Sequence, residues 1–105
     1  MIVMKYYLNT YQVESQFIVS VCDEDLLGKC FREEKKVLDL EKYSKFYKGV
    51  KADIDEIKKV ANQATVLNLV GKHIIEEAIR NKWCDEDNIQ YIAGVPQIQV
   101  YKMVF

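Results

Sequence analysis

The stretch at residues 66–82, VLNLVGKHIIEEAIRNK, constrains the fold of this chain more than any other segment. Its aliphatic residues recur at helical spacing, and its charged residues fall on the opposite side, as a half-buried helix requires. The aliphatic stripe comprises Leu67, Val70, Ile74, Ile75, Ala78 and Ile79, and the polar side comprises Lys72, His73, Glu76, Glu77 and Arg80. The pattern predicts the core helix of a small domain.

The start of this helix is open to two interpretations. Thr65 and Val66 favour a strand, whereas the spacing of Val66 and Val70 already suits a helix. Leu69 lies off the aliphatic stripe, so we expect the helix to begin only at Asn68, with that side chain as its N-cap. Asn81 is the expected left-handed terminator.

The rest of the chain alternates between strand patterns and one further helix. Residues 2–9 and 16–21 predict an antiparallel hairpin joined by a polar connection at 10–14, with Phe17, Val19 and Val21 facing the core. Residues 30–40 predict a short edge hairpin that turns near 33–35. Two last strands are expected at 89–93 and 98–104, linked through the turn Gly94-Val95-Pro96.

A second helix is predicted directly behind a capping box formed by Asp53 and Glu56, and it should end near Gln63. Residues 41–51 lack a firm period and are expected to form an ordered loop. The resulting order predicts an α+β fold, with a largely antiparallel sheet and two helices packed on one face. At 105 residues the chain is expected to form a single domain over 1–105.

Composition narrows the class of protein. Apolar residues make up 50% of the chain and charged residues 30%, which is typical of a folded domain. The net charge of -1 implies no overall attraction to nucleic acid or lipid, so any such binding needs a local basic face. No apolar run approaches the ~20 residues that span a bilayer, and the N-terminus does not resemble a signal peptide. We therefore expect a cytoplasmic protein with no membrane partner; its oligomeric state is left open.

The cysteines do not form a metal-binding pattern. Cys22, Cys30 and Cys84 are widely spaced, and the chain has one histidine, so we predict no metal site and no cofactor. Buried structural thiols are the expected state. A disulfide stays open if the source is a thermophile, which the abundant Lys, Glu and Tyr and the single Pro favour.

Three short blocks, CDEDLLGK at 22–29, NLVGK at 68–72 and IAGVPQIQV at 92–100, together resemble an archaeal family known only as domain of unknown function 424. The resemblance covers nearly the whole chain. It implies an archaeal origin, a small α+β domain, no established activity and an association with translation genes. Members of that family usually carry a histidine after the proline of the last block, where this chain has Gln97. The blocks define a family-motif surface: Cys22, Asp23, Glu24, Lys29, Asn68, Gly71, Gly94, Pro96, Gln97 and Gln99.

Several of these residues are candidates for chemistry. The acids at 23–25, between Cys22 and Lys29, suit acid–base or nucleophilic work or a hard cation, but they equally suit a capped turn. Gly71 either opens a helix N-terminus towards an anion or packs closely against a strand. Gln97, Gln99 and Tyr101 share a strand face, which could hydrogen-bond bases or a peptide edge, or simply be solvated.

The segment at 42–51 combines lysines with aromatic residues and contains no acid. Lysines neutralise phosphates and aromatic rings stack on bases, so this composition favours single-stranded RNA. The predicted RNA-binding residues are Lys42, Tyr43, Lys45, Phe46, Tyr47, Lys48 and Lys51.

The function predicted from the sequence is a non-enzymatic accessory module that binds RNA, the ribosome or a translation factor. One alternative is a small enzyme with a pocket between residues 22–29, Asn68 and residues 94–97. Another is a protein-interaction domain or a homodimer that pairs an exposed edge strand.

Overall fold

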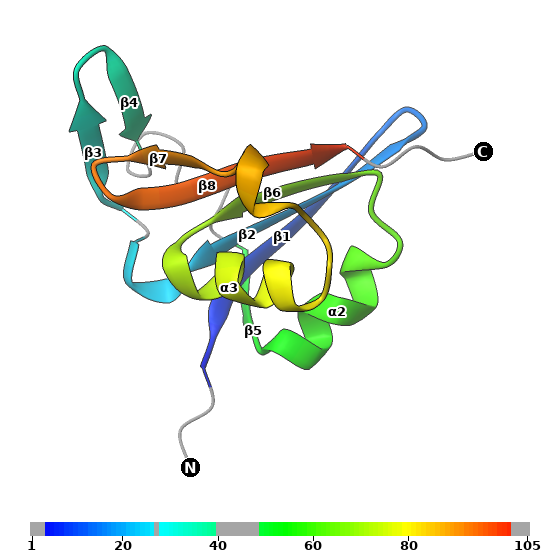
Figure 1. Ribbon diagram of the computed structural model, residues 1–105. Helices are drawn as coiled ribbons and strands as arrows, with labels where there is room; N and C mark the ends of the chain where they lie inside the picture. The colour runs from blue at the N-terminus through cyan, green and yellow to red at the C-terminus, as the bar shows by residue number, and fades with distance from the viewer. Residues whose placement is uncertain (1–3, 27, 40–48, 102–105) are drawn as a thin grey trace.

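The computed structural model describes residues 4–26, 28–39 and 49–101. Six of the described strands form one sheet in the order β5-β1-β2-β6-β8-β7 (Figure 1). Their bounds are Tyr6–Val13 for β1, Gln16–Asp23 for β2, Val50–Ala52 for β5, Val66–Val70 for β6, Gln90–Ile92 for β7 and Val95–Tyr101 for β8. The β2–β6 pair is parallel, and every other neighbouring pair is antiparallel.

Two helices, α2 (Ile54–Ala61) and α3 (Lys72–Arg80), pack on the same face of this sheet (Figure 1). Ile57 of α2 and Ile74 of α3 are fully buried in one cluster with Val19 and Leu69 of the central strands. This arrangement confirms the predicted α+β class and the largely antiparallel sheet. Neither helix is long and apolar enough to cross a membrane, and the same holds throughout the described residues.

The opposite face of the sheet is covered at one end by the hairpin β3 (Cys30–Glu33) and β4 (Lys36–Asp39). Its apolar residues form a second buried cluster on the sheet, which includes Leu38, Phe31, Cys22, Val70, Ile92 and Val95. The hairpin was predicted at this place in the sequence. Its two strands pair only with each other, however, so they form a separate small sheet and not an edge of the main one.

The predicted core helix at 66–82 is wrong in its first part, because residues 66–70 form the central strand β6. All five residues of β6 are buried, and the strand lies between β2 and β8, so a nearly continuous apolar run suits it. The helix begins at Lys72, and Asn68 is not its N-cap. The predicted burial of Ile74 and Ala78 is confirmed, since both are 0% exposed.

Smaller boundary errors also have local causes. The β1–β2 hairpin turns only at residues 14 and 15, because β1 pairs with β2 as far as Val13. Asn81 is not left-handed, since its φ is -89°, and its side-chain amide donates to the Glu77 carbonyl oxygen at 2.7 Å. Lys82 takes the positive φ of 60° instead. The α2 helix ends at Ala61 rather than near Gln63.

The predicted loop at 41–51 is only partly described. Its last residues enter β5, a short strand on the edge of the sheet that pairs with Tyr6, Tyr7 and Leu8 of β1. Residues 40–48 lie outside the described residues, and the remainder of the predicted loop falls there.

The predicted capping box at the start of α2 is present and generates a test. The Asp53 carboxylate accepts the Glu56 backbone N–H at 3.0 Å, and the Glu56 carboxylate accepts the Asp53 N–H at 3.3 Å. Replacing Asp53 with Ala should lower the free energy of unfolding by about 1 kcal/mol. Asp55→Ala, in the same helical turn, is the control and should cost less in urea denaturation. Equal effects of the two variants would contradict the capping role.

Candidate functional site

The three sequence blocks meet on adjacent strands, because β2, β6 and β8 are neighbours in the sheet. The register aligns Cys22 with Val70, and Val70 with Gln97. The blocks are far apart in the chain, and the fold brings them to one end of these strands. Their contacts there decide which of the candidate residues are free to act.

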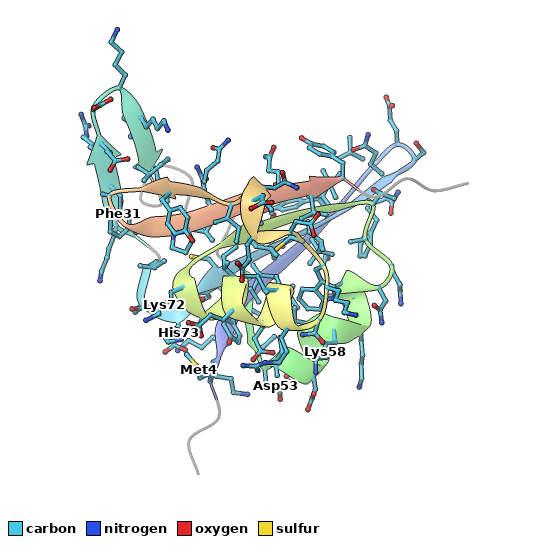
Figure 2. The ribbon with its side chains drawn as sticks, viewed as in Figure 1. Met4, Phe31, Asp53, Lys58, Lys72 and His73 are labelled. Atoms are coloured by element: carbon cyan, nitrogen blue, oxygen red, sulfur yellow. The ribbon has the colours of Figure 1, made fainter. Side chains whose placement is uncertain are left out.

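Asp23 ends β2 and binds the first turn of α3. One carboxylate oxygen accepts the His73 backbone N–H and the other accepts the Ile74 N–H, both at 2.9 Å. Asp23 is only 3% exposed, so these bonds form in a largely desolvated place. The carboxylate thereby caps a helix that begins about fifty residues later in the chain. Lys72 and His73 mark this helix start in Figure 2.

Gly71 fits between this carboxylate and the neighbouring strand. Its φ is 121°, and an added Cβ would lie 2.3 Å from the Asp23 Cγ atom. Its N–H donates to the Pro96 carbonyl oxygen at 2.9 Å. Of the two roles considered for Gly71, close packing is therefore the one observed. The α3 N-terminus is already occupied by Asp23 and does not face an external anion.

The candidate nucleophile and acid have environments that favour structural roles. Burial, together with the negative charges of Asp23 and Asp25, raises the pKa of the Cys22 thiol to about 12. The thiol is 0% exposed and donates to the Asp23 carbonyl oxygen at 3.3 Å. Burial also raises the pKa of the Asp23 carboxyl, and the two backbone hydrogen bonds oppose that rise. Cys22 is therefore a neutral thiol near pH 7 and a poor nucleophile.

The charged side chains near Cys22 and Asp23 do not gather into one site. Glu24 is exposed and lies 3.6 Å from the Lys51 ammonium, which is also 5.8 Å from the centre of the Tyr7 ring. Lys29 is exposed, and its backbone N–H donates to the Leu26 carbonyl oxygen. Within residues 4–26, 28–39 and 49–101, no three His, Cys, Asp or Glu side chains are grouped to hold a metal ion. The three cysteines are free thiols.

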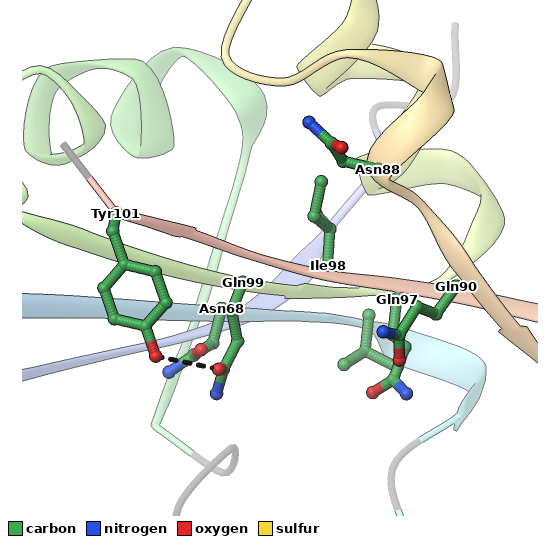
Figure 3. Close-up of a pocket in the computed structure, with 8 residues that line it drawn as sticks. Asn68, Asn88, Gln90, Gln97, Ile98, Gln99 and Tyr101 are labelled. Carbon is green, nitrogen blue, oxygen red and sulfur yellow. Dashed lines mark hydrogen bonds between the residues drawn. The ribbon is translucent and has the colours of Figure 1, made fainter.

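A pocket of about 400 Å³ lies at the β8 side of the sheet, and we call it the amide pocket. It is lined by Asn68, Val70, Asn88, Gln90, Gln97, Ile98, Gln99 and Tyr101. Figure 3 shows Asn68, Gln97, Gln99 and Tyr101 projecting to the same side of β8, whereas Asn88 and Ile98 lie on the other side. No lining residue carries a formal charge at pH 7, so the pocket offers amide and phenol hydrogen-bonding groups.

Asn68 is the most unusual residue of this pocket. It is 6% exposed, and its side-chain carbonyl oxygen has no hydrogen-bond partner. The register places it in a polar row across four strands, in which Asn9 pairs with Ser20, Ser20 with Asn68, and Asn68 with Gln99. The fully buried Ser20 hydroxyl is also unpartnered. An unpaired buried polar group is unfavourable, so the Ser20 hydroxyl and the Asn68 oxygen lower the stability of the sheet; both atoms are enclosed by the protein and are not open to a ligand.

Apart from the exposed Glu24 and Lys29 and the turn residue Gly94, the structure separates the family-motif surface into two groups. One group packs where β2, the start of α3 and β8 meet, and does not line the amide pocket: Cys22, Asp23, Gly71 and Pro96. The other group lines the pocket: Asn68, Gln97 and Gln99. Gly94, with a φ of 80°, forms the turn between β7 and β8. The enzyme pocket predicted between all three blocks is therefore only partly realised.

Of the predicted RNA-binding residues, Lys51 alone falls within the described residues; the following lie outside them: Lys42, Tyr43, Lys45, Phe46, Tyr47 and Lys48. The sequence analysis missed Gln90 and Asn88 as lining residues. The strand parity of Gln97 and Gln99 was visible, but the pairing of Gln90 with Gln97 depends on the β7–β8 register.

The close fit of Gly71 against Asp23 predicts a steric penalty. Gly71→Ala should destabilise the protein by about 1–3 kcal/mol more than Gly94→Ala, because the new Cβ meets the Asp23 side chain. Gly94 also has a positive φ but has open space around it, so its variant carries a backbone cost of about 1–2 kcal/mol without a close contact. Chemical denaturation of both variants measures the difference; similar losses would refute the steric account.

The thiol environments predict an order of reactivity. With a chromogenic disulfide reagent at pH 8, exposed Cys30 should react first and half-buried Cys84 more slowly. Cys22 should react only after unfolding in guanidinium, because its pKa is about 12 and its side chain is buried. A third thiol that is modified rapidly in the native protein would contradict this assignment. Cys22→Ser identifies the protected group.

Comparison with known proteins gives a family but no activity. A family model described as "Protein of unknown function (DUF424)" matches residues 11–103. No curated protein matches the chain. A solved structure, described as the crystal structure of an uncharacterized conserved protein from Methanopyrus kandleri, is similar to it with a TM-score of 0.74 and 23% identity, over 96% of both chains. That likeness supports the fold, and the match over most of the sequence shows that the chain belongs to the DUF424 family.

Proposed function

We propose that this protein is a non-enzymatic accessory module that binds single-stranded RNA in the cytoplasm of an archaeal cell, in the service of translation. The observation that carries the proposal is the character of the sheet face that holds the amide pocket. That face offers neutral amides and a phenol on β6, β7 and β8, and a lysine beside an aromatic ring on β5 and β1. In single-stranded RNA, the bases bind amide groups and aromatic rings, and the phosphates bind lysines.

The basic part of the proposed surface is connected to the amide part by strand register. Lys51 pairs with Tyr7, Tyr7 with Cys22, Cys22 with Val70, and Val70 with Gln97. Paired residues share a face of a sheet, so this row runs from the β5 edge to the amide pocket. Cys22 and Val70 are buried beneath the β3–β4 hairpin, so a strand of RNA would pass beside this hairpin to place phosphates near Lys51 and bases near the amides.

The sequence adds positive charge next to this row. The segment at 42–51 ends in β5, so its lysines and aromatic residues precede Lys51 directly in the chain. Lys51 is exposed, and its partner Glu24 is exposed too, which makes their ion pair weak enough to exchange for a phosphate. We therefore assign Lys42, Lys45, Lys48 and Lys51 to phosphate contacts.

The alternative enzymatic function has less support. Its two most reactive candidates, Cys22 and Asp23, are buried and engaged with the backbone. The amide pocket is lined by side chains that can hydrogen-bond a ligand but are not suited to transfer a proton near pH 7.

The homodimer alternative is favoured by one observation. Beyond Gln97, the outer edge of β8 has no pairing strand among those described, since β7 begins at Gln90, which lies opposite Gln97. Such an edge can accept a strand from another chain. Sedimentation equilibrium decides this alternative, which requires a solution mass of twice the 12.3 kDa chain.

The RNA proposal predicts a charge-specific binding profile. Fluorescence anisotropy with a labelled twelve-nucleotide oligouridine should give an affinity that falls steeply with salt. Lys51→Gln should weaken binding and lower the slope of log affinity against log salt by about 0.7, as expected for one phosphate contact on a single strand. Lys45→Glu combined with Lys48→Glu should abolish binding.

The control for this experiment is Lys59→Gln. Lys59 is exposed on α2, which packs on the other face of the sheet, so its loss changes the net charge equally without touching the proposed surface. Binding that is independent of salt, or equal losses in the Lys51 and Lys59 variants, would contradict the proposal. Absence of any binding to oligouridine or to bulk archaeal RNA would reject it.

A further inference from the structure

We infer that the outer edge of β8 at residues 98–101 binds an extended, uncharged segment of a partner protein, which adds a strand to the main sheet. This inference goes beyond the proposed RNA-binding function and does not depend on it. It rests on three observations: backbone groups that point away from the sheet, a pocket that passes round this edge, and the lack of charge along both.

The backbone direction of β8 is fixed by its neighbours. The Gly71 N–H donates to the Pro96 carbonyl oxygen at 2.9 Å, so the backbone groups of Pro96 point towards β6. In an antiparallel strand this direction alternates from one residue to the next. The N–H and C=O groups of Gln99 and Tyr101 therefore point outwards. Among the described residues no strand pairs with them there, because β7 lies beside β8 only as far as Gln97 (Figure 1).

The amide pocket passes round this edge. Gln99 and Tyr101 line it on one side of β8, and Asn88 and Ile98 line it on the other (Figure 3). Because β6 covers the inner edge of β8, a pocket with walls on both sides of the strand must pass round the outer edge. Gln90, the first residue of β7, lines the end where β7 begins. The pocket of about 400 Å³ thus lies where a longer β7 would run.

The β8 edge lacks the features that protect the other edge of the sheet. Residues 98–101 are Ile, Gln, Val and Tyr, and no lining residue of the pocket carries a formal charge at pH 7. At the opposite edge, β5 is only three residues long and carries Lys51 at its centre. Short edge strands and edge lysines are common means of preventing strand addition. The β8 edge therefore accepts a strand, whereas the β5 edge discourages one.

The side chains of β8 select the sequence of the added strand. Ile98 and Val100 pack against the core on the helix side of the sheet, and directly paired residues share a face, so the residues opposite them should be apolar. The residues opposite Gln99 and Tyr101 should be polar but uncharged, because a charge would enter the pocket without a compensating group. The expected partner is therefore an extended segment of four residues that alternate between apolar and neutral polar.

A second copy of this chain fits the edge less well than a flexible segment does. Each β8 is paired with its own β7 as far as Gln97, so two copies would overlap over residues 98–101 only. Four residues a side are far fewer than the roughly 20–30 of a stable interface between folded proteins. A flexible segment can enter the pocket and contact both of its walls, as peptides do when they extend a sheet.

A phage-displayed library of random seven-residue peptides tests the inference. Selection on the immobilised protein should enrich peptides in which four consecutive residues are uncharged and alternate between apolar and polar. A fluorescently labelled synthetic copy of the most enriched peptide should bind in anisotropy titrations. Gln99→Lys should weaken this binding about tenfold or more, because a lysine on an edge opposes strand addition. Gln63→Lys, which changes an exposed glutamine after α2, is the matched control and should leave the affinity unchanged.

Amide hydrogen exchange followed by NMR identifies the mode of binding. In the free protein, the outward N–H groups of Gln99 and Tyr101 should exchange fast, whereas the inward N–H groups of Ile98 and Val100 should be protected by β6. Saturating peptide should slow exchange at Gln99 and Tyr101 about tenfold or more and leave the other two unchanged. A peptide that bound through side chains alone would not produce this alternation.

Three results would overturn the inference. The first is a selection that enriches no peptide over the support without protein. The second is an enriched peptide that leaves the Gln99 and Tyr101 amides in fast exchange. The third is a free protein that is dimeric in solution and already protects these amides, since a second copy would then occupy the edge.

Discussion

The structure depends on one carboxylate that joins the sheet to the helix layer. Asp23 ends a central strand and accepts the backbone N–H groups of His73 and Ile74 in the first turn of α3, both at 2.9 Å. Those N–H groups have no partner within the helix, and the positive end of the helix dipole favours the negative charge. The desolvation cost of the acid is thereby offset, and α3 is fixed against the strand that it covers. Gly71 is required by the same contact, because any side chain there would meet Asp23.

This contact also changes how the family blocks are understood. An acid, a cysteine and a glycine close to a helix start resemble a catalytic or anion-binding site in sequence. In the fold they complete one another, since Asp23 caps α3, Gly71 makes room for Asp23, and the Pro96 carbonyl oxygen accepts the Gly71 N–H. A demanding structural contact can therefore account for a motif with no reaction attached to it.

The two faces of the sheet then differ in what they leave available. The face beneath α2 and α3 is filled with aliphatic side chains. The other face is covered by the β3–β4 hairpin at one end and carries a polar row through Ser20, Asn68 and Gln99 at the other. A buried unpaired amide on a central strand lowers stability. Natural proteins tend to keep such unfavourable buried groups at or near their functional sites. For this reason the proposed function lies on this face.

Sequence by itself determined the elements that are specified by short-range patterns. Alternation defined the β1–β2 hairpin, the capping box at Asp53 defined the start of α2, and the spacing of Ile74 and Ala78 defined the buried side of α3. These features depend on residues close together in the chain, so their signals are local. The α+β class followed from their order.

Only the tertiary structure decided the rest. Residues 66–70 carry apolar spacing that suits a strand or a helix, and burial between β2 and β8 selected the strand. The cap of α3 comes from Asp23, and the amide pocket arises where Asn68, Gln97 and Gln90 meet on three strands. Such contacts join residues that are distant in the chain, and no local pattern encodes which distant strands become neighbours.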